Sequence, residues 1–252
     1  MTAVQLPSSL ARNPRLDRWV EIRPDGTVAV RTGKVEIGQG LTTALAQIAA
    51  DELDVDFARI RMVPADTVRS PNEGVTAGSR SLSESGGAMR QVCAEVRHAF
   101  LQAAADRLGA GIDELSIRDG TIHWRASNQS ATYWELAGSV NLARDAAGNV
   151  QPKRPDQLSV VGRPVPRIDL PAKVTGAEVY VHDLDFPGML HARVLRPPSY
   201  RAELVSFDDL DNLVRNRAWR GLGPGELSWM WSASHMGHFH PLTWMSFALD
   251  LR

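Results

Sequence analysis

The sequence has one cysteine, Cys93, and this scarcity excludes several kinds of redox chemistry. One cysteine cannot form an internal disulfide, and a cysteine-ligated zinc site or an iron–sulfur cluster needs several. Cys93 lies within a helical apolar pattern without an adjacent base, so we expect a small buried side chain rather than a nucleophile. A redox centre of this protein must therefore be bound non-covalently or lie on another chain.

The chain also lacks a strong net charge and a long apolar run. Its 28 Lys and Arg residues nearly balance 29 Asp and Glu residues, giving a formal net charge of −1, whereas nucleic-acid-binding domains are basic. No apolar run approaches the roughly 20 residues of a membrane span, and residues 1–19 have no apolar core typical of a secretory signal. We therefore expect a soluble, cytoplasmic protein without a nucleic-acid partner, with a membrane-associated or periplasmic location through partners as the alternative.

Hydrophobic residues make up 43% of the chain, enough for a sizeable core, and their spacing predicts a mixture of helices and strands. Charged residues at the end of the first long helix, Asp51, Glu52 and Asp54, are expected to face solvent. The predicted elements, in chain order, are strands at 19–22 and 28–30, a helix at 41–53, a strand at 60–63, a helix from about 81 to 108, strands at 115–118 and 121–124, a helix at 133–140, and strands at 177–181 and 189–194.

Turn and cap signals set several of these limits. Pro24–Gly26 and Asp119-Gly120 are hairpin turns between the paired strands. Ser81 with Glu84 has the form of a capping box that would open the long helix, and Thr132 with the acidic residue three positions later would open the short one.

Two glycine-containing segments, Gly33–Gly40 and Thr76–Ser81, each stand immediately before a predicted helix. Glycine lets the backbone approach a ligand closely, and the first N–H groups of a helix have no partner within the helix. Such segments can cradle a phosphate-bearing cofactor. For Gly38–Gly40 alone, a tight strand-to-helix turn is the favoured interpretation, but the two segments together favour an anion site.

Three motifs follow one another in a family-specific order. Residues 34–40 read KVEIGQG, residues 71–79 read PNEGVTAGS, and residues 167–176 read RIDLPAKVTG. With the adjoining residues 182–192, they resemble the molybdopterin-binding large subunit of the xanthine dehydrogenase and aldehyde oxidase family. The likeness covers residues from about 17 to 208 and is strongest to bacterial isoquinoline oxidoreductases and nicotinate dehydrogenases.

The resemblance implies a molybdopterin cofactor, with its cytosine dinucleotide form left open. The metal of that family is held by the dithiolene of the pterin, so no metal-ligating side chain is expected. Gln39 would bond the pterin or the periphery of the molybdenum site, and the backbone amides around Gly38 and Gly40 would approach the cofactor. A second cradle would offer donors in series, which suit a phosphate. The residues of that second cradle are Thr76, Ala77, Gly78, Ser79 and Ser81.

A complete relative would oxidise an aldehyde or an N-heterocycle with water as the oxygen source and would pass electrons to an iron–sulfur subunit. The cofactor supplies that chemistry while the protein orients it. The catalytic glutamate of the family lies far downstream of the matching part, so we assign no catalytic residue, Glu36 included, and expect the chain alone to be inactive. The alternative is a non-catalytic module that binds a phosphate ligand or takes part in assembly.

The implied fold class is α+β, with a two-layer sheet-and-helix molybdopterin-binding unit followed by a partial a/b hammerhead-like β-rich unit. A stretch rich in Pro, Gly, Asp and Arg separates the two. The predicted parts are an N-terminal extension (1–16), a partial molybdopterin-binding domain (17–142), a linker (143–172), a partial hammerhead-like unit (173–210) and an unrelated tail (211–252).

The tail resembles a short segment of bacterial membrane glycosyltransferase-like proteins with tetratricopeptide repeats. We interpret it as the result of a gene fusion or frameshift, and a glycosyltransferase-related protein is a third hypothesis. His235, His238 and His240 with Asp250 have a spacing that can converge on a metal. No neighbouring group is visible to fix them, so partial burial explains them equally and no metal site is predicted.

Overall fold

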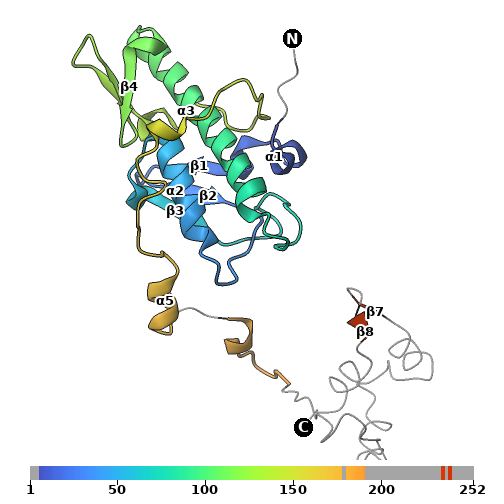
Figure 1. The fold of residues 1–252 in the computed structure, drawn as a ribbon. Coiled ribbons are helices and arrows are strands. Elements are labelled where there is room, and N and C mark those ends of the chain that lie inside the picture. The colour runs from blue at the N-terminus through green and yellow to red at the C-terminus, as the bar shows by residue number, and fades with distance from the viewer. Residues whose placement is uncertain (1–5, 178–179, 191–233, 236–237, 240–252) are drawn as a thin grey trace, which may run out of the picture. The chain divides into compact units, whose positions relative to one another are not determined.

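The computed structural model describes residues 6–177, 180–190, 234–235 and 238–239 (Figure 1). The chain divides into two compact units, residues 1–178 and 179–252, which are described separately. The first unit combines helices with two small sheets, which confirms the α+β class. The finer division into five parts stays a prediction.

The first sheet contains β1 (Val20–Ile22), β2 (Val28–Arg31) and β3 (Ile60–Val63) in that order. β1 and β2 form the predicted antiparallel hairpin, and the Asp25 carboxylate closes its turn by accepting from the Thr27 amide at 2.9 Å. β2 and β3 run parallel, which requires a long crossover between them. The three predicted strands of this region are confirmed.

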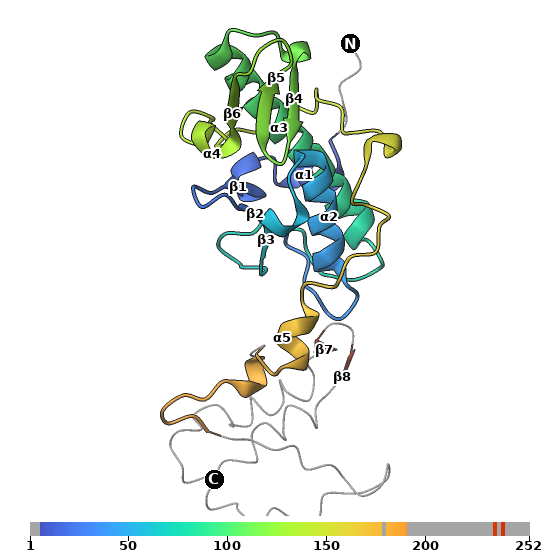
Figure 2. The same ribbon diagram turned by 90° about the vertical axis from the view of Figure 1, so that its left-hand side faces the viewer.

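The helices α2 (Leu41–Leu53) and α3 (Gly87–Leu108) lie side by side on one face of this sheet (Figures 1 and 2). Their apolar stripes form most of the core, because residues such as Leu45, Met89 and Phe100 are at most 1% exposed. The predicted helix at 41–53 and the predicted end of the long helix are therefore confirmed. Cys93 lies on α3 and is fully buried, as expected, and burial raises the pKa of its thiol.

The second sheet is antiparallel and contains β4 (Leu115–Arg118), β5 (Thr121–Trp124) and β6 (Ser130–Thr132). β4 and β5 form the predicted hairpin. The Asp119 carboxylate in its turn accepts from Arg59, with oxygen–nitrogen distances of 2.6 and 2.8 Å. This pair ties the second sheet to the segment that leads into β3.

Two predicted helix limits need correction. Ser81 does not cap the long helix, because the Glu84 amide donates to the Arg80 carbonyl at 2.9 Å and a π-helical turn, Ser81–Gly86, precedes α3. The capping box of Thr132 and Glu135 is confirmed, but the helix that it opens, α4 (Tyr133–Leu136), ends four residues before the predicted limit.

A third correction concerns the polar face of α2. Asp51 and Glu52 are 2% and 0% exposed rather than solvent-facing. The Asp51 carboxylate accepts from the amides of residues 159–161, and Glu52 accepts from the Lys153 amide and pairs with Arg90. The segment before α5 therefore runs along α2, as Figure 2 shows, and supplies the partners that make these carboxylates tolerable inside the protein.

The remaining elements are short. In the second unit, the strand predicted at 177–181 is wrong within the described residues, because Val181–Asp183 is a 3₁₀ turn. Of the strand predicted at 189–194, residues 189 and 190 are not in a strand and the others lie outside the described residues. The other short elements are α1 (Ser8–Arg12), α5 (Leu170–Val174), β7 (Ser234–His235), β8 (His238–Phe239), and 3₁₀ turns at Leu16–Arg18, Phe57–Arg59, Ile112–Glu114 and Pro155–Gln157.

Candidate functional site

The two glycine-containing segments predicted to form one site are neighbours in the structure. We call residues 33–40 the first loop and residues 71–81 the second loop. The Val35 amide donates to Thr76 Oγ1 at 2.9 Å, and Lys34 Nζ donates to the carbonyls of Glu73 and Val75 at 2.9 and 3.1 Å. A Cβ atom on Gly33 would lie 2.1 Å from the Pro71 carbonyl oxygen, so this approach requires glycine.

A buried polar cluster fixes the base of both loops. Glu73 is 3% exposed, and its Oε2 accepts from Thr32 Oγ1, the Gly33 amide and Ser85 Oγ at 2.7 to 3.0 Å. Its Oε1 is buried and has no partner among the described residues. Three donors on one oxygen offset the cost of removing this carboxylate from water. Glu73 and Lys34 lie within the motifs, but their residue types alone did not predict this role.

The anion-binding capacity of the first loop is used by the chain itself. The Glu36 carboxylate accepts from the amides of Gly38, Gly40 and Thr42 at 2.8, 2.9 and 3.0 Å. Burial disfavours its charge, but the three amide donors outweigh burial and hold the Glu36 pKa below its ordinary value. The N-terminus of α2, which was expected to offer unpaired amides, is thus capped by an internal carboxylate.

The Gln39 side chain closes the first loop. Its Oε1 accepts from the Ile37 amide at 2.6 Å, and its Nε2 donates to the Val35 carbonyl at 2.9 Å. Both polar ends of Gln39 therefore have partners within its own loop. A contact of Gln39 with a cofactor, like the contacts of Gly38 and Gly40, stays a prediction.

The second loop offers what the first loop does not. Within the described residues, the backbone amides of Thr76, Ala77, Gly78 and Ser79 have no hydrogen-bond acceptor. Gly78 and Ser79 both have positive φ, 68° and 55°, and successive turn residues of this kind can aim N–H groups into one concave site. Ser81 begins the π-helical turn directly after them. This segment has the donor set of an anion site.

Apolar side chains on the two loops and directly after the second loop are exposed to solvent. Four of them are between 49% and 72% exposed, namely Val35, Ile37, Val75 and Leu82. Exposed apolar side chains gathered near polar backbone groups are typical of ligand or protein contacts.

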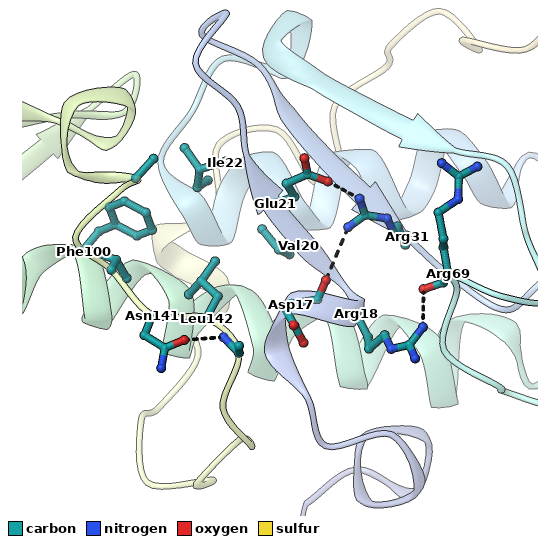
Figure 3. Close-up of a pocket in the computed structure, with 13 residues that line it drawn as sticks. Asp17, Arg18, Val20, Glu21, Ile22, Arg31, Arg69, Phe100, Asn141 and Leu142 are labelled. Atoms are coloured by element: carbon teal, nitrogen blue, oxygen red, sulfur yellow. Dashed lines mark hydrogen bonds and ion pairs between the residues drawn. The ribbon is translucent and has the colours of Figure 1, made fainter.

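A separate cavity of about 480 Å³ opens beside β1 and the region after α4 (Figure 3). Its charged wall is internally paired, because Arg31 binds the Glu21 carboxylate and the Asp17 carbonyl. None of its lining residues belongs to either loop. They are Asp17, Arg18, Val20, Glu21, Ile22, Arg31, Arg69, Phe100, Ala137, Val140, Asn141, Leu142 and Ala143.

A match to a protein-family profile shows the family of the chain. The profile described as the molybdopterin cofactor-binding domain matches residues 3–183, well over half of the sequence. The chain belongs to this family. The match confirms the family resemblance drawn from the three motifs.

Two curated members of the family illustrate the relationship. A nicotinate dehydrogenase subunit of Pseudomonas putida is 41% identical over 181 residues, which are 71% of this chain and 15% of the relative. The beta subunit of isoquinoline 1-oxidoreductase from Brevundimonas diminuta is 31% identical over 236 residues, 78% of this chain and 30% of the relative. The chain thus spans less than a third of either relative, and each is named as a subunit.

Among solved structures, quinoline 2-oxidoreductase from Pseudomonas putida 86 aligns with a TM-score of 0.41 and 30% identity, over 48% of this chain and 15% of that one. Neither of the two curated relatives is a glycosyltransferase, and the likeness of the tail to one finds no support. The part of the chain that the structure describes contains no helix long and apolar enough to cross a bilayer. It also contains no group of three or more His, Cys, Asp or Glu residues arranged to hold a metal.

Proposed function

We propose that this chain is a molybdopterin-binding part of a molybdenum hydroxylase and that the second loop holds the phosphate of the cofactor. The observation that carries the proposal is the set of amides at Thr76–Ser79, which have no acceptor among the described residues, lie beside the first loop and precede the π-helical turn that leads into α3. Amides in series before a helix attract a phosphate without needing a cation.

The residues present fit the cofactor in part. The second loop provides donors for a phosphate, and the exposed apolar side chains Val35 and Val75 provide a surface for a planar pterin. The first loop, held shut by Glu36 and Gln39, would contact the pterin through its outer edge. When bound, the molybdenum cofactor supplies the oxidation chemistry, in which an electron-poor carbon gains an oxygen from water. We propose the cytosine dinucleotide form of the cofactor, and analysis of the nucleotide released from the purified chain would test it.

The role that we assign to this chain is binding and orientation rather than catalysis. Glu36 is committed to three amides, and Glu73 is buried beneath the loops, so neither is free to serve as a general base. We propose N-heterocycles or aldehydes as substrates of the complete enzyme, and the nicotinate dehydrogenase and isoquinoline oxidoreductase relatives support the N-heterocycles. An iron–sulfur subunit is proposed as the electron acceptor, because the chain has a single, buried cysteine.

The test is cofactor content. The chain would be purified from a host that makes molybdopterin, and its pterin and molybdenum would be measured after denaturation. We expect Gly78→Ala to lower the content at least fivefold, since a side chain at positive φ distorts the second loop. Gly162→Ala, which carries the same backbone strain outside both loops, is the matched control and should retain the wild-type content.

The alternative, a non-catalytic module for another phosphate ligand, makes a different prediction. The same amides would then bind pyrophosphate or a nucleotide in calorimetry, and the purified chain would contain no pterin. Absence of pterin from the wild type together with nucleotide binding would replace the proposal with this alternative.

A further inference from the structure

Three Arg-x-Asp sequences form the same local fork in the structure. In each, the guanidinium group binds both oxygens of the carboxylate two residues later. The pairs are Arg15 with Asp17, Arg154 with Asp156, and Arg167 with Asp169. The last of them differs from the other two in what else the arginine touches.

Arg167 reaches from the RIDLP motif to the first loop, 129 residues earlier. Its Nη1 donates to the Gly38 carbonyl at 3.1 Å, and its Nη2 lies 3.7 Å from Glu36 Oε1. A Cβ on Gly40 would also lie 3.8 to 4.0 Å from the Cζ, Nε and Cδ atoms of Arg167. One guanidinium group thus contacts both the carbonyl face of the loop and the carboxylate that holds its amides.

The position of Arg167 is itself fixed. Asp169 is a shared acceptor for Arg167 and Lys173, and these two cations hold its pKa well below the ordinary value. The Ile168 amide donates to Thr43 Oγ1 at 3.1 Å, which fastens the same segment to the first turn of α2. The arginine is therefore held by the carboxylate two residues later, in a segment that is fastened to α2 at the next residue.

We propose that Arg167 is a positioning residue for the cofactor site. It clamps the outside of the first loop, keeps Glu36 in its amide nest and so holds the loop at a fixed distance from the second loop. Because a planar guanidinium group makes the carboxylate fork and the carbonyl contact at once, lysine can replace it only in part. This inference rests on the proposed function only in the identity of the ligand, since the clamp itself is seen in the protein alone.

The decisive variants are Arg167→Ala and Arg167→Lys in the full chain, with Arg154→Ala as the matched control because it removes the same fork without a loop contact. Amide hydrogen exchange would be followed in peptides covering residues 36–43 and α3, and pterin content would be measured on the same samples. We expect about tenfold faster exchange at 36–43 in Arg167→Ala, a smaller effect in Arg167→Lys, and no change in α3. Pterin content should fall in the same order.

Unchanged exchange at 36–43 in Arg167→Ala, relative to the control, would overturn the clamp. Faster exchange with wild-type pterin content would overturn the positioning role. Equal acceleration in α3 would also overturn it, because the arginine would then stabilise the whole unit. If the wild type contains no pterin while exchange changes as expected, the proposed function fails and the clamp on the first loop is supported.

Discussion

The first and second loops have similar sequence features but differ in how their backbone amides are hydrogen-bonded. Each contains glycines and stands before a helix, but the amides of the first loop donate to Glu36, whereas those at Thr76–Ser79 have no acceptor in the described structure. The two loops are joined by the bond from the Val35 amide to Thr76 Oγ1. Glycine before a helix therefore predicts a flexible backbone, but it does not predict an anion site that is free to bind a ligand. A carboxylate of the chain itself can bind the same amides.

Among the variants that test the difference between the two loops, Glu36→Ala should have the largest effect on stability. This change leaves three amides without their acceptor and removes the ion pair between Glu36 and Arg167, so we expect the free energy of unfolding to fall by about 2 kcal/mol. Urea unfolding followed by circular dichroism measures it. Glu114→Ala is the control, because this exposed carboxylate accepts from one amide, and it should cost about 0.5 kcal/mol. Equal losses in the two variants would mean that the Glu36 nest adds no stability.

The stabilisation that Glu36 provides should depend on pH, because it requires the charged carboxylate. Because its pKa is lowered by folding, its contribution is complete above the unfolded value of about 4.3 and is lost as the pH falls through the folded value. The difference in unfolding free energy between wild type and Glu36→Gln should therefore be constant from about pH 7 to 5 and shrink below about pH 4. Urea titrations at several pH values test this. A difference that persists undiminished to about pH 3, or is already gone at about pH 5, contradicts the assignment.

The bond between the loops should have an intermediate effect. Thr76→Val removes the acceptor of the Val35 amide and is expected to cost about 1 kcal/mol. Thr121→Val is the matched control, since the Thr121 hydroxyl has no partner within the described residues and valine suits a strand. A cost no larger than that of the control would show that the bond between the Val35 amide and Thr76 does not help to hold the two loops together.

The smallest effect is expected from Ser79→Gly in the second loop. Glycine removes the strain of a positive φ but is more flexible when unfolded, so the two contributions nearly cancel and stability should stay within about 0.5 kcal/mol of wild type. Thermal unfolding gives the measurement. A loss comparable with that of Glu36→Ala would show that the second loop is a structural support rather than an open donor set.

Local patterns predicted much of the fold. The helix at 41–53, the two hairpins and the end of the long helix follow from signals within a few residues, because periodic apolar residues, Asp-Gly turns and a terminal glycine act locally. The predicted start of the long helix is wrong, because the Glu84 amide donates to the Arg80 carbonyl instead of the Ser81 hydroxyl. A capping-box sequence permits that bond but does not exclude its competitors.

The features that the sequence did not predict depend on hydrogen-bond partners that lie far away along the chain. Asp51 was expected to face solvent because it is charged, yet residues 159–161 supply its donors more than a hundred positions later. Arg167 and the first loop are joined in the same way. For the candidate site, the sequence predicted that the two segments lie together, and they are neighbours in the structure. It could not reveal that Glu36, only two residues before Gly38, accepts from the amides of the first loop.

The most direct test of the account is the hydrogen exchange of individual amides by NMR, in the chain prepared with and without molybdopterin. We predict that Gly38, Gly40 and Thr42 are protected in both preparations and that Thr76–Ser79 exchange rapidly without the cofactor and become protected with it. Rapid exchange at Gly38 and Gly40 in the cofactor-free chain, or no change at Thr76–Ser79 on binding, would contradict the claim that the second loop is the one that holds the phosphate.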